Sequence, residues 1–388
     1  MNFENTQIAF ESKSNGALKQ AHFLFSSMGK PWLTKWGIRF TLAALKMKLP
    51  IQGIIKKTIF KQFCGGETLE EASNTALQLK KYGIDVIMDY GVEGKSDEAE
   101  FEKNVHTFIR TIEFSSDKAH IPFISLKVTG FADFQLLEKV HAEFPLSVEE
   151  QEAFARVKNR VKIICEAAAK NGKMILIDAE ESWIQQPVDD LVDEMMALFN
   201  RERVVVFNTF QLYRHDRLAF LKSSFEKAQK GTYLLGAKLV RGAYMEKERA
   251  RALEMNYPSP IQENKAASDR DFDAALSFCI EHLPSLEVFI GTHNESSCLL
   301  AVALMQQKNM EKNQPGIYFS QLYGMSDNIS FNLSKEGYHV SKYLPYGPVA
   351  DVIPYLMRRA QENTSVAGQT GRELGLIQKE LKRRAESK

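Results

Sequence analysis

The stretch Tyr233-Leu-Leu-Gly-Ala-Lys-Leu-Val240 decides the fold. It is a nearly continuous apolar run, which is typical of a parallel strand that is buried on both faces. Seven other runs of the same kind are spread along the chain. Together the eight runs predict strands at Ile84–Asp89, Ile121–Val128, Met174–Asp178, Val204–Asn208, Tyr233–Val240, Leu286–Thr292, Gly316–Leu322 and His339–Leu344.

Amphipathic stretches with a helical period, such as Phe272–Glu281 and Ser296–Lys308, separate these runs. Eight strand–helix units over about 280 residues favour the α/β class and a TIM-like (β/α)8 barrel with an N-terminal helical arm. A doubly wound sheet is the alternative, but no Gly-x-Gly-x-x-Gly motif follows any of the runs. We therefore predict an arm at 1–82, a barrel at 83–365 and a charged tail at 366–388.

The composition is that of an ordinary globular protein: 388 residues, of which 44% are hydrophobic and 26% charged. No apolar run approaches the ~18 to 20 residues that span a bilayer, and no signal sequence is evident. The four cysteines form no Cys-x-x-Cys pair, which favours free thiols in a reducing compartment. We expect a cytoplasmic protein that binds peripherally at the inner face of the membrane.

Charge is distributed unevenly along the chain. Residues 12–66 contain ten Lys or Arg side chains and no Asp or Glu, while the rest of the chain has 40 basic and 49 acidic side chains. Aromatic residues such as Trp32 and Trp36 lie among these basic residues. The pattern indicates contact of residues 13–61 with an anionic membrane surface, or packing of a helical arm on the barrel. A nucleic-acid partner is not expected, because the remainder is acidic and would repel phosphate.

Polar residues follow the predicted strands. In a barrel of this kind the chemistry lies at the carboxyl ends of the strands. Lys127 and Lys238 are the clearest cases, because a charge beside an apolar strand is costly unless it has a partner or a role. The full set of polar residues at these ends is Asp89, Glu93, Lys127, Asp178, Asn208, Gln211, Lys238, Arg241, Thr292, His293, Gln321 and Tyr343.

The segment after the eighth run carries the strongest local pattern. Asp351 can cap a helix, with Pro354 in its first turn. Tyr355, Arg358 and Arg359 then stand at i, i+3 and i+4, on one helical face. Two guanidinium groups and a phenol suit a small carboxylate with an apolar body. A solvated basic face is the alternative.

These segments resemble the proline dehydrogenases, and most closely the stand-alone, monofunctional members. The resemblance covers residues from about 60 to 375, and the motifs occur in the family's order. The motifs are Asp89-Tyr-Gly-Val-Glu93, Asp178-Ala-Glu-Glu181, Phe207-Asn-Thr-Phe-Gln211, Lys238-Leu-Val-Arg-Gly-Ala-Tyr244, Gly291-Thr-His-Asn294, Gln321-Leu-Tyr-Gly-Met325 and Tyr355-Leu-Met-Arg-Arg-Ala-Gln-Glu-Asn363.

The resemblance implies an FAD enzyme that oxidises L-proline to Δ1-pyrroline-5-carboxylate, the first step of proline catabolism. Hydride would pass from C5 of proline to N5 of the flavin, and the electrons would go on to membrane quinone. By their motif positions, the cofactor-binding residues would be Ala179, Gln211, Arg241, Gly242, Ala243, Tyr244, Thr292 and His293.

The same resemblance implies that the substrate-binding residues are Lys127, Tyr343, Tyr355, Arg358, Arg359 and Glu93. Asp178 and Lys238 would be the catalytic residues, with Asp178 orienting its neighbours. Many bacterial members have arginine where this chain has Lys238, which leaves the charge but removes the planar fork. Glu93 is expected to pair with Arg358 as a latch.

Tyr343 favours proline as the substrate, because members of the family that prefer hydroxyproline have a serine at this position. Hydroxyproline dehydrogenase remains the alternative. Two more distant alternatives are a metal-dependent barrel hydrolase with Asp178 and His293 as ligands, and a barrel retained only for binding. Histidine is sparse at the predicted strand ends, so no metal is expected.

Overall fold

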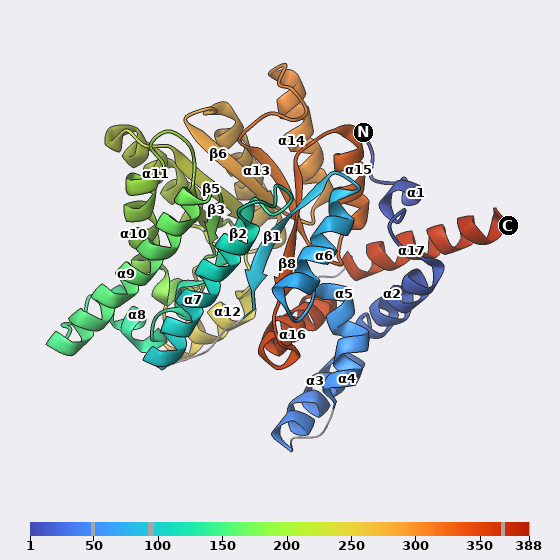
Figure 1. Ribbon diagram of the computed structural model, residues 1–388, viewed down its shortest axis with the longest axis horizontal. Helices are drawn as coiled ribbons and strands as arrows, with labels where there is room; N and C mark the ends of the chain where they lie inside the picture. Colours follow the sequence, from blue (N-terminus) through green and yellow to red (C-terminus); the bar gives the residue numbers. More distant parts are fainter. Residues whose placement is uncertain (48–50, 92–96, 366–368, 388) are drawn as a thin grey trace. The chain divides into compact units, whose positions relative to one another are not determined.

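The computed structural model describes residues 1–47, 51–91, 97–365 and 369–387, and its strands form a closed barrel in the order β1 to β8 (Figure 1). Strands β2 to β7 pair in succession and β1 pairs with β8, all in parallel. The eight predicted strands and the (β/α)8 class are confirmed, with strand ends shifted by up to three residues. The strands are β1 Ile84–Tyr90, β2 Phe123–Leu126, β3 Met174–Ile177, β4 Val206–Gln211, β5 Leu235–Val240, β6 Leu286–Gly291, β7 Ile317–Leu322 and β8 Val340–Tyr346.

By its internal contacts the chain divides into two compact units, Met1–Glu93 with Gln321–Lys388, and Gly94–Ser320. In the second unit helices alternate with β2 to β6. Three phenylalanines from alternate strands meet there: the ring centroid of Phe289 lies 4.7 Å from that of Phe123 and 5.8 Å from that of Phe207. Such layers from alternate strands fill the interior of a TIM barrel. The helices are α7 Glu98–Ser115, η2 Val128–Gly130, α8 Phe134–His141, α9 Val148–Lys170, α10 Ser182–Phe199, α11 Arg217–Gly231, α12 Met245–Glu254, α13 Lys265–Glu281 and α14 Glu295–Gln307.

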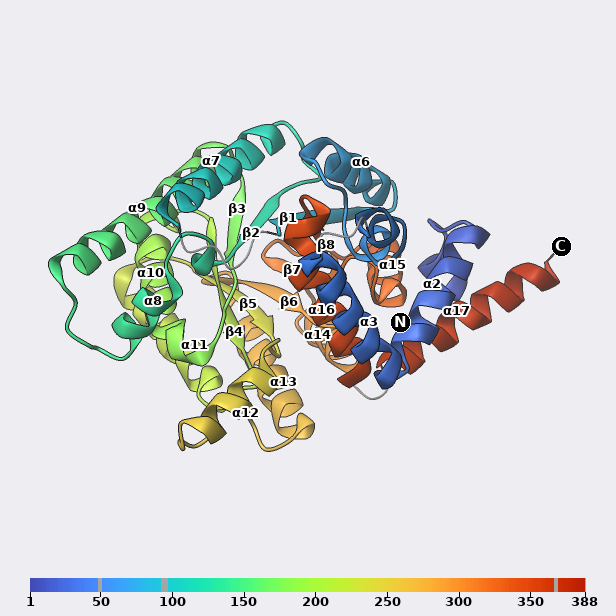
Figure 2. The same ribbon diagram turned by 90° about the horizontal axis from the view of Figure 1, so that it is seen from below.

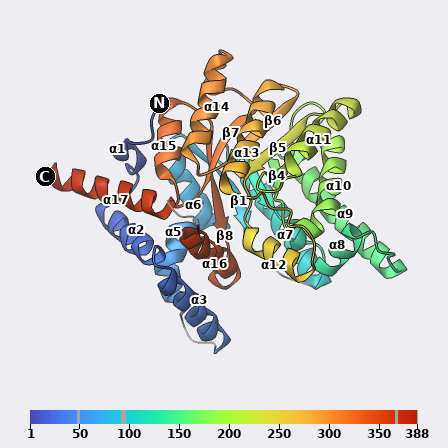
Figure 3. The same cartoon turned by 180° about the vertical axis from the view of Figure 1, so that it is seen from behind.

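The first unit holds β1, β8 and the helices from both ends of the chain. Figures 2 and 3 show α2 and α17 lying side by side, and residues of these two helices contact each other. Phe25, Phe63, Leu356 and Leu376 are among the buried side chains of a core that draws on residues 9–64 and 325–377. The helices are α1 Thr6–Ala9, α2 Asn15–Met28, α3 Pro31–Lys46, α4 Gln52–Ile55, η1 Lys56–Phe60, α5 Lys61–Phe63, α6 Leu69–Lys80, α15 Asp327–Glu336, α16 Val349–Ser365 and α17 Gln369–Glu386.

A group of charges lies within the first unit, and we call it the sealed cluster: Lys13, Asp327, Lys342 and Glu373. All are buried except Lys13, whose side chain is 20% exposed. Asp327 lies 2.8 Å from the Nζ atom of Lys13 and 2.8 Å from that of Lys342. Glu373 accepts a hydrogen bond from the backbone N–H of Ser326 at 3.1 Å. Burial raises the pKa of Glu373 to about 7, whereas the two lysines bring that of Asp327 down to about 2 against its desolvation.

Helix α16 differs from the sequence prediction at its start. It begins at Val349, so Asp351 lies inside the first turn instead of capping the helix. Pro354 consequently lies beyond the first turn, inside the helix. An acidic side chain in the first turn still interacts favourably with the helix dipole, which explains why Asp351 looked like a cap. Among the described residues, no helix combines the length and the apolar character needed to cross a membrane.

Candidate active site

Three charged residues that are far apart in the sequence meet at the strand ends of the second unit, and we call them the strand-end cluster: Lys127, Asp178 and Lys238. Lys127 directly follows β2, Asp178 directly follows β3, and Lys238 lies within β5. The Nζ atom of Lys238 donates a hydrogen bond to Oδ1 of Asp178 at 2.5 Å. The Nζ atom of Lys127 lies 3.9 Å from Oδ2 of the same carboxylate. The structure thus places Asp178 between two lysines.

A second carboxylate fixes the loops that carry this cluster. Glu180 accepts hydrogen bonds from the backbone N–H of Thr129 at 3.1 Å and from its hydroxyl at 2.5 Å. Burial raises the pKa of Glu180 to about 7, and the hydrogen bonds from Thr129 oppose that shift. The contact joins the turn after Lys127 to the turn after Asp178. The sequence analysis missed this role, although Glu180 lies within the Asp178-Ala-Glu-Glu181 motif.

Asn208, one of the strand-end candidates, belongs to a buried supporting network. Its Nδ2 atom donates to Asp189 at 3.0 Å, and Arg217 donates to the same carboxylate at 2.9 and 3.0 Å. Gln185 also donates to Asp189, at 3.1 Å, and accepts from the backbone N–H of Glu180 at 2.8 Å. The network therefore ties β4 to α10 and α11 and holds the turn that contains Glu180.

Arg241 directly follows β5 and is held on several sides. Its guanidinium donates to Asp269 at 2.7 Å, to the Thr292 hydroxyl at 2.8 Å and to the Ser297 hydroxyl at 3.0 Å. It also lies 4.4 Å from the centroid of the Phe272 ring. The structure brings together the predicted pair Arg241 and Thr292. Asp269, Phe272 and Ser297 lie in helices α13 and α14 and had no motif to mark them.

The position after Arg241 has room only for glycine. Gly242 has a φ of +136°, and an added Cβ would lie 2.4 Å from the ring of Tyr213. On the neighbouring strand, Oε1 of Gln211 at the end of β4 is buried and accepts no hydrogen bond from any residue that the structure describes. A buried acceptor without a partner points to a missing donor. These two features fit a flavin, whose ring carries N–H groups and whose phosphates approach backbone closely.

The remaining predicted cofactor residues lie on three loops of the second unit. Ala179 is buried in the turn after β3. Ala243 and Tyr244 lie between β5 and α12, and Ala243 is exposed. Thr292 is buried and His293 half-buried between β6 and α14. These loops follow strands β3, β5 and β6, on the same edge of the parallel sheet as Lys127 and Asp178.

The predicted substrate residues of the first unit come from β8 and α16. Tyr343 and Tyr355 are buried, Arg359 is buried and Arg358 half-buried. The guanidinium of Arg359 lies 5.0 Å from the centroid of the Tyr355 ring, as residues at i and i+4 on one helical face should. The predicted latch residue Glu93 lies outside the described residues. Within the described part of the chain, no group of three or more His, Cys, Asp or Glu side chains could hold a metal ion.

The chain matches known proteins over most of its length. The family model "Proline dehydrogenase" matches residues 72–372. The carbapenem antibiotics biosynthesis protein CarD of Pectobacterium carotovorum is 35% identical over 89% of this chain and 90% of its own length. Mitochondrial proline dehydrogenase 1 of Dictyostelium discoideum is 30% identical over 98% of this chain and 74% of its own length.

Among solved structures, proline utilization A from Bdellovibrio bacteriovorus is similar to the chain with a TM-score of 0.73. The sequence identity is 21%, and the match covers 94% of this chain but only 37% of that protein, so this likeness concerns the fold. The family model and the curated relatives identify the family as well as the fold, because both match the sequence over most of its length. The chain belongs to the proline dehydrogenase family, a family of flavin-dependent oxidoreductases.

Proposed function

We propose that the protein uses FAD to oxidise L-proline to Δ1-pyrroline-5-carboxylate, the first step of proline catabolism. The observation that carries the proposal is the strand-end cluster, in which Asp178 lies between Lys127 and Lys238. The ammonium groups of the two lysines lie beside this carboxylate, at or near the ends of their strands, and carry positive charge. That charge suits the carboxylate of an amino acid, and Lys127 is the residue we expect to bind it.

FAD would be held by Gln211, Arg241, Gly242 and the neighbouring loop residues Ala179, Ala243, Tyr244, Thr292 and His293. Oε1 of Gln211 would accept from an N–H group of the flavin, and the backbone at Gly242 would lie against the cofactor. The cofactor supplies the two-electron acceptor for the hydride that leaves C5 of proline. The protein supplies position and charge.

The charges of the two lysines would also affect the protonation of the substrate. The ring nitrogen of proline must lose its proton before the hydride leaves, because an iminium forms only from the neutral amine. Cations that bind the carboxylate disfavour a second positive charge nearby and so lower the pKa of that nitrogen. Asp178 moderates this field and holds Lys238 in place through the 2.5 Å hydrogen bond. We propose that Asp178 acts by orienting and charge balance.

The family resemblance adds the arginine pair of α16 as a second substrate clamp. Replacing Arg358 or Arg359 with methionine is expected to raise KM for proline, with a loss of about 2 to 5 kcal/mol for a desolvated charge pair. Flavin content, read from the visible spectrum, should stay normal in both variants. An unchanged KM in both would remove the arginines from the substrate site.

We further propose that the electrons pass to membrane quinone and that the first unit contacts the inner face of the membrane from the cytoplasm. Support comes from α3, where Trp32, Trp36 and Phe40 are spaced four residues apart and are 63%, 66% and 64% exposed. Aromatic side chains on one exposed helical face are typical of the membrane interface. The surrounding segment 12–66 has no acidic side chain, which favours an anionic surface.

Vesicles of anionic phospholipid test this contact. Lys56 is a poor target, because it pairs with Glu67. The exposed Arg39 and Lys57 are better, and their double replacement by glutamate should weaken vesicle binding and make it less sensitive to salt. Lys162 and Lys170, which are exposed on α9 of the second unit, are replaced in the same way as the matched control. Binding that neither salt nor the Arg39 and Lys57 changes affect would argue against membrane contact.

The oxidation itself is tested on the purified full-length chain. A flavin absorption band should be present, L-proline should bleach it in the absence of oxygen, and the product should react as a cyclic imine. A protein that binds flavin but is bleached only by hydroxyproline would support the alternative substrate. A protein reconstituted with FAD that neither imino acid bleaches would contradict the proposal.

A further inference from the structure

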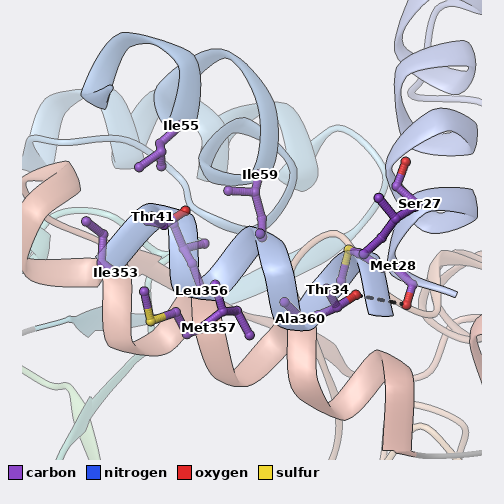
Figure 4. Close-up of a pocket in the computed structure, with 13 residues that line it drawn as sticks. Ser27, Met28, Thr34, Thr41, Ile55, Ile59, Ile353, Leu356, Met357 and Ala360 are labelled. Carbon is purple, nitrogen blue, oxygen red and sulfur yellow. Dashed lines mark hydrogen bonds between the residues drawn. The ribbon is translucent and has the colours of Figure 1, made fainter. Parts of the chain in front are cut away.

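A cavity of about 260 Å³ lies behind the arginine helix, within the first unit (Figure 4). Helix α16 contributes Ile353, Leu356, Met357 and Ala360, which stand at i, i+3, i+4 and i+7 and form one apolar stripe. Figure 4 shows these side chains on α16 opposite Ile55 of α4 and Ile59 of η1. Tyr355 and Arg359 are not among the lining residues, so the cavity is separate from the candidate active site.

The cavity wall is almost entirely apolar. None of the described side chains that line it carries a charge. One of its few hydroxyl groups, that of Thr34, already donates to the carbonyl of Met28 at 3.3 Å (Figure 4). Protein interiors are normally close-packed, and a void lined by apolar side chains offers water no hydrogen bonds. The chemistry of the wall therefore suits a hydrocarbon and excludes a polar ligand.

Helix α3 separates the cavity from the exposed aromatic face. Gly37 and Ile38 line the cavity, whereas Trp32, Trp36 and Phe40 on the same helix are largely exposed. Gly37 lines the cavity and is itself exposed, and an added Cβ would meet no atom within 4 Å, so the cavity reaches the surface of the first unit at this point of α3.

We infer that this cavity binds the hydrocarbon chain of a membrane lipid, which enters along α3 beside Trp32 and Trp36. The occupant is identified by three features: the apolar wall, the opening at Gly37, and the aromatic, acid-free segment around the opening. The inference deepens the proposed membrane contact and rests on it. A lipid chain in the cavity packs against the apolar stripe of α16, on the helix that carries Arg358 and Arg359.

The test is calorimetric titration of the full-length protein with saturated fatty acids from octanoic to palmitic acid, without proline or vesicles. Affinity should rise about three- to fourfold for each added methylene until the cavity is filled. Gly37→Leu, which fills the opening, should weaken palmitate binding by about tenfold or more. Gly375→Leu is the matched control, because Gly375 is also an exposed helical glycine whose added Cβ would meet nothing.

Thr41→Leu, at another lining position, provides a second variant with the same expected direction. An affinity that does not depend on chain length, or an equal loss in the Gly37 and Gly375 variants, would overturn the inference. So would binding of a short-chain isoprenoid quinone when no fatty acid binds, because the occupant would then not be a lipid chain. Palmitate binding that survives a failure of vesicle binding or of proline oxidation would separate this inference from the proposed function.

Discussion

The molecule contains two buried clusters in which one aspartate lies between two lysines, and they differ in how closely the lysines are held. In the sealed cluster, Asp327 lies 2.8 Å from both Lys13 and Lys342. In the strand-end cluster, Asp178 lies 2.5 Å from Lys238 but 3.9 Å from Lys127. Asp327 and Lys342 are less exposed than the side chains of the strand-end cluster, whereas Lys13, at 20%, is the most exposed of the six.

The difference separates a structural use of the motif from a functional one. Both lysines lie within hydrogen-bond distance of Asp327 and compensate its charge, so its cluster stabilises the fold of the first unit. The longer contact of Lys127 leaves its ammonium group outside hydrogen-bond distance of Asp178, at a strand end where a substrate carboxylate could approach. A Lys–Asp–Lys motif alone therefore does not mark a site; we propose that its asymmetry and its place at a strand end distinguish the functional cluster.

The largest expected effect concerns the sealed cluster. Asp327→Ala should lower the free energy of unfolding by about 3 to 5 kcal/mol, because Lys13 and Lys342 would lose their buried counter-charge. Urea denaturation measures the change. Asp85→Ala is the control: Asp85 pairs with Lys80 near the surface and should cost at most about 1 kcal/mol. A similar small decrease in the free energy of unfolding in both variants would show that the sealed cluster does not stabilise the fold.

The next effect concerns the strand-end cluster. Lys127→Met should raise KM for proline, with about 2 to 5 kcal/mol of lost binding, while flavin content and the free energy of unfolding change little. Steady-state kinetics measure KM, the visible spectrum measures flavin content, and urea denaturation measures the free energy of unfolding. Lys80→Met provides a surface control. A loss of stability with an unchanged KM would make this cluster structural like the other.

Sequence reasoning predicted the two clusters very unequally. Lys127, Asp178 and Lys238 stood out because each lies at or near the end of an apolar strand, where chemistry is expected. Lys342 lies inside β8 and gave no such signal, and its partner Lys13 is more than 300 residues away in the chain. Contacts of this kind depend on tertiary packing, which no local pattern encodes.

The same limit applied to details around the candidate site. The eight strands could be predicted because a buried parallel strand leaves a continuous apolar run. Asp269 and Ser297, which hold Arg241, could not, because both are ordinary polar residues on amphipathic helices. The start of α16 was misplaced by three residues because an acidic residue favours the first turn almost as well as the cap position.

The free energy of unfolding should depend on pH through Glu373 of the sealed cluster. The pKa of Glu373 is about 7 in the folded protein against an ordinary 4.5, so the folded state binds this proton more tightly than the unfolded chain. The stability that protonated Glu373 contributes is therefore fully present below pH 4.5 and is lost as the pH rises through 7. Glu373→Gln should remove this slope and stabilise the protein at pH 8 by up to about 3 kcal/mol.

Thermal or urea unfolding across that pH range measures the slope in the parent and the variant. Glu11→Gln, at an exposed glutamate, is the control and should leave the slope unchanged. An equal slope in the parent and in Glu373→Gln would show that Glu373 ionises normally in the folded protein.

The smallest effect concerns substrate choice. Tyr343 directly follows Lys342 in β8, so the two side chains point to opposite faces of the sheet, and only Lys342 joins the sealed cluster. We expect kcat/KM for L-proline to exceed that for trans-4-hydroxy-L-proline by about tenfold or more, because a buried hydroxyl without a partner costs about 1 to 3 kcal/mol. Tyr343→Ser should reduce the ratio of kcat/KM for L-proline to kcat/KM for trans-4-hydroxy-L-proline. An equal or reversed preference in the parent would favour hydroxyproline as the substrate.

The central claim is that the strand-end cluster serves the oxidation of proline, and anaerobic single-turnover reduction of the bound flavin by L-proline tests it most directly. The account predicts rapid bleaching in the parent protein. In Asp178→Asn the rate should fall at least about a hundredfold with flavin content unchanged, because the carboxylate that orients Lys238 and Lys127 is lost. Bleaching at the parental rate in Asp178→Asn, with normal flavin content, would contradict the claim.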